Sequence, residues 1–168
     1  CGISMPGVLE LAAEPPMLRV FPASQGQSLN PAIQCLLGEH MSVTGNFDLS
    51  GHMEGKLKES PFSKGLRGEL AFHARDGRIY RYELLSKIFA FLNLTELLRG
   101  KLPDMGKEGF AYNTMHAKAD LLDGRLVIRE AAIDGKSMEI GCEGEVDLLR
   151  DQLDLRVLVA PLKTVDFI

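Results

Sequence analysis

Strict alternation of apolar and polar residues is the feature that most constrains the fold of this chain. Between Val43 and Leu57 every odd-numbered residue is apolar or glycine, and every even-numbered residue is polar. Successive side chains of a strand point to opposite faces of a sheet, so this pattern predicts one long strand with an apolar and a wet face. Similar patterns predict further strands at Leu66–Arg75, Met138–Leu148 and Leu153–Val159, more weakly at Thr114–Leu121, and as short strands near Val8–Ala12 and Met17–Phe21.

Three Asp-Gly pairs are expected to reverse the chain between strands: Asp76-Gly77, Asp123-Gly124 and Asp134-Gly135. Asp-Gly favours the type I′ turn, whose twist matches that of the strands it joins. Another tight reversal is expected at Leu148–Gln152, and a strand at Arg125–Ile133. Strands joined by tight turns pair antiparallel. The sequence therefore predicts a mainly β (α+β) fold, with one long antiparallel sheet that is apolar on one face.

Two helices are expected between the strands. Asn30-Pro31 offers an N-cap followed by proline at the first helical position, which predicts a short helix at about 31–37. A second helix is expected at about 80–99, where apolar residues cover more than half of the circumference. One part of it should pack on the sheet, and the rest needs another surface. The residues expected to dock or cap are Leu84, Ile88, Phe89, Phe91, Leu92, Leu94 and Leu98.

The composition is that of an ordinary globular domain. The chain has 168 residues, of which 45% are hydrophobic and 25% charged, and it can bury a substantial core. The net charge is −4 and the basic residues are scattered, which argues against a nucleic-acid surface. No apolar run reaches the roughly 18 residues of a membrane-spanning helix. We expect a single domain, 1–168, cut from a longer protein, with an N-terminal β segment (1–65) and a second region (66–168).

No catalytic or metal-binding pattern is present in the sequence. His52, His73 and His116 fall on the polar faces of expected strands, where solvated surface is the simplest interpretation. The chain lacks a nucleophile elbow, a phosphate-binding loop and a zinc-protease motif. We therefore expect neither an enzyme nor a cofactor or metal site.

The three cysteines are too few for a disulfide scaffold and lack zinc-site spacing. Cys1 and Cys35 could pair and leave Cys142 over. The alternatives are three free thiols or a lipid attached to Cys1, since an N-terminal Cys-Gly also resembles the start of a mature bacterial lipoprotein.

The apolar sheet face allows two interpretations. It is either a core covered by the apolar helix or, in part, an open groove for acyl chains. A groove of a few hundred Å² is costly to leave wet at roughly 25 cal/mol per Å² of apolar surface, so it calls for a ligand or a partner. The residues expected to line the groove or core are Val43, Phe47, Leu49, Leu70, Phe72, Met138, Ile140, Val146, Leu155 and Val157.

Three segments resemble the C-terminal region of bacterial AsmA-like proteins, a superfamily that includes TamB and the YhdP-type proteins. They read LRGELAFHARDGRIYRYELLSKIFAFLNLTELLRGKLPD, EGFAYNTMHAKADLLDGRLVIREAAIDGKSMEIGCEGEVDL and LDLRVLVAPLKTVDFI, and together cover about Leu66–Ile168. The resemblance implies a long, curved sheet with a hydrophobic inner groove, in a periplasmic protein held by an inner-membrane anchor. It also implies a non-enzymatic role in moving phospholipid towards the outer membrane and in envelope integrity.

These implications set the functional expectations. The partners would be phospholipid or another acyl-chain ligand and envelope proteins, and exposed sheet edges could allow self-association. An oxidising periplasm would favour a Cys1–Cys35 disulfide. The alternative is a structural or assembly module that docks through its apolar helix on a partner protein or a membrane surface.

Overall fold

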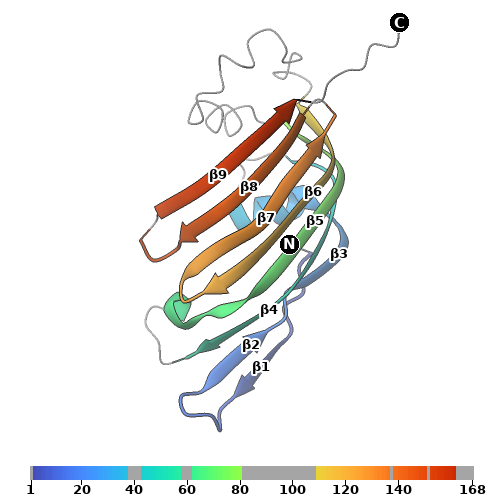
Figure 1. Ribbon diagram of the computed structural model, residues 1–168. Helices are drawn as coiled ribbons and strands as arrows, with labels where there is room; N and C mark the ends of the chain where they lie inside the picture. The colour runs from blue at the N-terminus through green and yellow to red at the C-terminus, as the bar shows by residue number, and fades with distance from the viewer. Residues whose placement is uncertain are drawn as a thin grey trace, which may run out of the picture.

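The computed structural model describes residues 2–37, 43–57, 62–80, 109–136, 138–150 and 152–161. These residues form one open sheet of nine antiparallel strands and a short helix (Figure 1), which confirms the predicted fold class. The elements are β1 (Gly7–Glu10), β2 (Met17–Val20), β3 (Ala23–Ser28), α1 (Leu29–Leu37), β4 (Asn46–Lys56), a 3₁₀ turn (Phe62–Gly65), β5 (Arg67–Ile79), β6 (Phe110–Leu122), β7 (Arg125–Gly135), β8 (Met138–Asp147) and β9 (Gln152–Pro161).

The strand order is β1-β2-β4-β5-β6-β7-β8-β9, and β3 also pairs with β4. β2 and β3 share one edge of β4, because β2 pairs with Met53–Lys56 and β3 with the stretch from Asn46 to Ser50. From β4 onward each strand pairs with the next one along the chain. The sequence did not indicate β3, whose residues are mostly polar.

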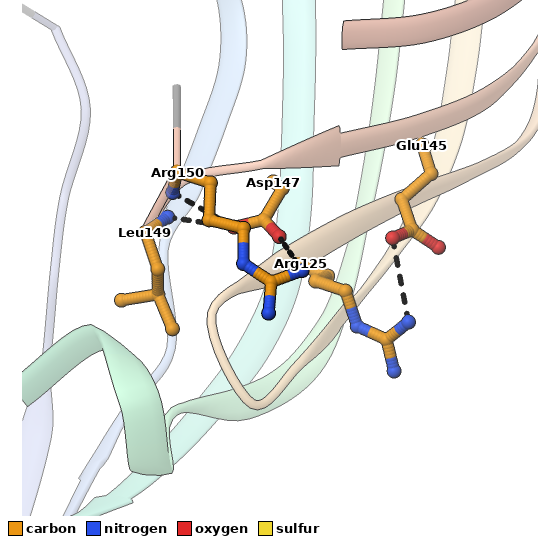
Figure 2. A network of polar contacts seen from close by, with 5 residues as sticks. All are labelled: Arg125, Glu145, Asp147, Leu149 and Arg150. Carbon is orange, nitrogen blue, oxygen red and sulfur yellow. Dashed lines mark hydrogen bonds and ion pairs between the residues drawn. The ribbon is translucent and has the colours of Figure 1, made fainter. Parts of the chain in front are cut away.

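The chain reversals that follow β6, β7 and β8 occur where the sequence predicts them. Asp123 and Gly124 have φ values of 50° and 86°, as a type I′ turn requires, and they join β6 to β7. Between β8 and β9, an Asp147 carboxylate oxygen accepts hydrogen bonds from the backbone N–H groups of Leu149 and Arg150, at 2.9 and 3.0 Å (Figure 2). Arg125 and Glu145 form an ion pair close by, at 3.3 Å. The third Asp-Gly pair ends β7, and the chain reverses just after it, between Gly135 and Met138.

The prediction of a turn at Asp76-Gly77 is wrong, because β5 continues through this pair to Ile79. Asp76 has a φ of 53°, but Gly77 has no positive φ, so the two residues cannot form a type I′ turn. Glycine is needed here for a different reason. A Cβ at position 77 would lie 2.0 Å from the carbonyl oxygen of Thr44 and 2.3 Å from the Tyr112 hydroxyl.

Asp76 and Asn113 are extra residues in two neighbouring strands. β5 and β6 keep one register on both sides of them. The register of β6 with β7 shifts at Asn113, and the bridge between Val43 and Ile79 lies one position out of the register of β4 with β5. The two residues are thus facing bulges. Bulges bend strands and increase their twist, so this pair curves the sheet.

The short helix was predicted at nearly the right place, but it starts earlier. α1 begins at Leu29, whose N–H donates to the carbonyl oxygen of Gly45 at 2.9 Å. Asn30 therefore lies inside the helix, and its buried side-chain oxygen has no hydrogen-bond partner among the described residues, so the predicted N-cap is wrong. The second predicted helix, about 80–99, falls almost entirely outside the described residues and stays a prediction. No helix within the described ranges is long and apolar enough to cross a bilayer.

Candidate apolar groove

One face of the sheet is apolar across its whole width. The strand registers place Phe47, Ala74, Met115, Ile133, Ile140 and Val159 in one row. A second row, further from α1, runs through Met53, Gly68, Leu121, Leu126, Val146 and Leu153. The opposite face carries ion pairs between neighbouring strands, such as Arg75–Asp48 at 2.7 Å and Arg156–Glu143 at 2.9 Å. This division follows directly from the alternation in the sequence.

α1 covers one end of the apolar face. The helix lies behind β6 and β7 in the view of Figure 1. Its Leu29 and Ala32 are buried among sheet residues, and Ile33 packs against the same cluster. Phe47 is one of the most buried residues of this cluster and stacks on Phe72 with ring centroids 5.9 Å apart. The buried sheet residues of the cluster are Val43, Phe47, Ala74, Ile79, Phe110, Tyr112, Met138 and Ile140.

Tyr112 is a buried polar residue of the cluster beneath α1. The Tyr112 hydroxyl donates a hydrogen bond to the carbonyl oxygen of Thr44 at 2.6 Å. Burial, and to a lesser degree the nearby charge of Asp76, raises the pKa of this hydroxyl. Tyr112 thereby holds the facing bulges against the chain that leads into β4.

The ten residues predicted to line a groove or core fall into three groups. Val43, Phe47, Met138 and Ile140 are buried in the cluster beneath α1. Leu49, Phe72 and Val157 are half-buried and pack against that cluster. Leu70, Val146 and Leu155 are half-buried on the same face but lie outside the cluster. The structure thus divides one predicted set between a core and the more open part of the face.

We call this open part the open apolar face. It comprises Leu70, Val146 and Leu155 together with Leu9, Leu18, Met53, Leu126 and Leu153, which the same registers place beside them. Leu9 and Leu153 are 50% and 67% exposed. The sequence prediction omitted these five residues. The sequence does not show that Leu126 lies on this face, because the pairing register shifts after Ile128. It does not show the face of Leu18, because the pairing of β2 with β4 cannot be predicted from the sequence.

The polar face holds a hollow of about 920 Å³. His73 and His116 lie opposite each other at its floor, and His116 contacts a Glu130 carboxylate oxygen at 3.0 Å. The hydrogen bond with His116, followed by the charge of Lys118, lowers the pKa of Glu130. Within the described part of the chain, no group of three histidine, cysteine or acidic side chains could hold a metal ion.

The cysteines lie on different elements. Cys142 is a free thiol on the apolar face of β8, and burial raises its pKa. Cys35 lies on α1, whereas Cys1 falls outside the described residues, as do the seven predicted docking residues of the second helix.

Comparison with known proteins adds one match. The family model described as YhdP protein matches residues 28–165. No curated protein and no solved structure matches the chain.

Proposed function

Because the chain belongs to the YhdP protein family, we propose that it is a non-enzymatic module of a periplasmic, AsmA-like envelope protein whose open apolar face carries phospholipid acyl chains. One observation supports this most directly: α1 fills only one end of an apolar face that continues across the sheet. Apolar surface that no described residue covers calls for an apolar ligand.

The dimensions of the sheet suit an acyl chain. Neighbouring strands lie about 4.8 Å apart, so the six strands β4–β9 span roughly 24 Å. One acyl tail occupies about half of the 30 Å hydrocarbon core of a bilayer, or roughly 15 Å. A tail lying across the strands would therefore meet apolar side chains along its whole length, while the ion-paired face stays in water.

The test compares two leucines on β9 that are equally exposed on opposite faces. Leu153 is 67% exposed on the apolar face, and Leu158 is 71% exposed on the polar face. The delipidated chain is mixed with phosphatidylethanolamine vesicles, re-isolated and extracted for mass spectrometry. We expect Leu153→Asp to lower the recovered phospholipid several-fold and Leu158→Asp to leave it unchanged. Equal recovery from both variants, or none from the wild-type chain, would refute the proposal.

The alternative role, docking through the second helix, predicts a different outcome. Phe91→Ser and Leu98→Ser would then abolish co-purification with a partner while phospholipid recovery stays at the wild-type level. If both changes instead lower phospholipid recovery, the helix serves the groove.

We also propose the Cys1–Cys35 disulfide, which the periplasm would favour. Gly2, the neighbour of Cys1, lies against β3, the strand that leads into α1. Its carbonyl oxygen accepts a hydrogen bond from the Ser24 hydroxyl at 2.9 Å. Alkylation of the denatured chain should label Cys142 alone before reduction and all three cysteines after it. Labelling of all three thiols without a reductant would contradict this pairing.

A further inference from the structure

Exposed leucines mark the chain reversals along one side of the sheet, on the left in the view of Figure 1. We call them the leucine rim: Leu57 after β4, Leu122 at the end of β6, and Leu148 and Leu149 after β8. Each is between 41% and 48% exposed. Each reversal joins two strands that pair with each other, so this exposure does not come from an open sheet edge. Neighbouring strands lie about 4.8 Å apart, so the rim presents leucine about every 10 Å over roughly 20 Å.

Contacts between neighbouring reversals hold the rim in place. The Leu148 N–H donates to the carbonyl oxygen of Gly124 at 2.9 Å, and the Leu57 N–H donates to that of Pro16 at 3.0 Å. A Cβ at Gly124 would lie 2.7 Å from Cδ1 of Leu149, so this side chain lies against the turn between β6 and β7. The leucines are therefore presented by reversals that are tied to one another.

Basic side chains flank every part of the rim. They are exposed, and they are Lys56, Arg67, Arg125 and Arg150. Leu122, for example, lies between Arg67 and Arg125 in the strand register. Each of the three arginines also contacts a carboxylate, so the charge along the rim is nearly balanced.

We propose that the leucine rim docks on the surface of a zwitterionic phospholipid bilayer, with its leucines at the acyl boundary and its basic side chains at the phosphates. Apolar side chains beside cations suit the boundary between acyl chains and headgroups. A zwitterionic headgroup carries both charges, as the rim does. A stable protein partner would need a continuous interface of about 800 Å² on this chain. The rim instead offers separate side chains, which a fluid bilayer can accept one by one.

The rim borders the open apolar face. Leu126 is the second residue of β7, and Val146 is the second-last residue of β8. A docked rim therefore brings the end of the open apolar face to the bilayer, where an acyl chain can pass between the two. This route rests on the proposed function, whereas the docking itself does not require the face to carry lipid.

Vesicle flotation tests the docking. The whole chain should float with vesicles made of equal parts of phosphatidylcholine and phosphatidylethanolamine. It should stay bound in about 1 M salt, because the leucines rather than net charge hold it. Leu122→Asp and Leu148→Asp should each lower the bound fraction about tenfold or more, from the apolar surface that is no longer buried. Leu158→Asp, on the polar face and away from the rim, should float like the wild type.

Fluorescence gives a second readout, since the chain has no tryptophan. In Leu148→Trp the emission should shift to the blue on addition of the same vesicles, and brominated phospholipid should quench it. Leu158→Trp should show neither effect. Circular dichroism spectra and thermal melts verify that each variant folds.

The outcomes separate docking from lipid carriage. A wild-type chain that does not float, release by salt, or Leu122→Asp and Leu148→Asp variants that float like the wild type would each overturn the docking. So would an unshifted Leu148→Trp emission. A chain that yields phospholipid after re-isolation but never floats loses the docking and keeps the proposed function. A chain that floats through its rim but yields no phospholipid keeps the docking and loses the proposed function.

Discussion

The division of the apolar face into a core and an open part can be tested with two alanine substitutions. Phe47 is 2% exposed beneath α1, and its ring stacks on Phe72. Phe47→Ala should cost about 3–5 kcal/mol, because it removes a buried aromatic ring and leaves a cavity. For a chain of this size, each kcal/mol lowers the melting temperature by about 2–4 °C, so the expected fall is about 6–20 °C.

Leu155→Ala changes the same face but should have a much smaller effect. Leu155 is half-buried and lies outside the cluster, so its removal deletes about half the transfer free energy of three carbon atoms and leaves no cavity. At roughly 0.8 kcal/mol per buried methylene, the cost is about 1 kcal/mol, or about 2–4 °C.

The assay is urea unfolding followed by circular dichroism, with the denaturant slope compared between variants. Equal slopes with a large shift for Phe47→Ala and a small one for Leu155→Ala support the division. If Leu155→Ala costs as much as Phe47→Ala, the second part of the face is packed like the first and cannot be an open surface. That result would also remove the basis of the lipid proposal.

Three further predictions concern single contacts. Tyr112→Phe should cost about 1–2 kcal/mol at neutral pH. The folded-state pKa of Tyr112 is raised, so the stabilisation from its hydroxyl is complete below the unfolded-state pKa of about 10 and is lost as the pH rises through the folded value. In urea unfolding at alkaline pH, the free energy of unfolding should therefore fall less with rising pH in the variant than in the wild type. Asp147→Ala should cost about 0.5–2 kcal/mol in thermal melts, whereas Arg150→Ala should change little because its guanidinium lies 3.9 Å from the carboxylate and is 76% exposed. Arg67 lowers the pKa of Asp123, mainly by hydrogen bonding to its carboxylate. The charged Asp123 therefore stabilises the folded state above about pH 3.9, and this stabilisation is lost as the pH falls through the folded-state pKa. Asp123→Asn keeps a type I′ turn sequence, so its deficit against wild type in urea unfolding should shrink on acidification, and a constant deficit would contradict the role of the charge.

Much of this fold could be predicted from alternation alone. The period-two pattern located β4, β5, β8 and β9, because a half-exposed strand must keep its apolar side chains on one face. It missed β3, a polar strand held by backbone pairing with β4 and by a hydrogen bond from the Gly26 N–H to Asp48 at 2.7 Å. The formation of such a strand depends on pairing with its neighbour, and its own sequence has no apolar–polar alternation that would predict it.

The Asp-Gly pairs show a second limit. Asp123-Gly124 forms the predicted turn, whereas Asp76-Gly77 has the same two residues within a continuous strand. The dipeptide permits a positive φ, but the surrounding pairing decides whether that conformation makes a turn or a bulge. The prediction of the candidate groove had the same limit. Tertiary packing decides which part of the apolar face α1 covers, and the alternation in the sequence does not show it.

The facing bulges at Asp76 and Asn113 have a consequence for how such a sequence can change length. Deleting either residue alone would remove one bulge and leave the other, so β5 and β6 would lose their common register beyond that point. Deleting both together would keep the apolar residues of both strands pointing inward. The two positions, 37 residues apart in the chain, therefore behave as a single insertion shared by two strands, and related sequences should gain or lose them as a pair.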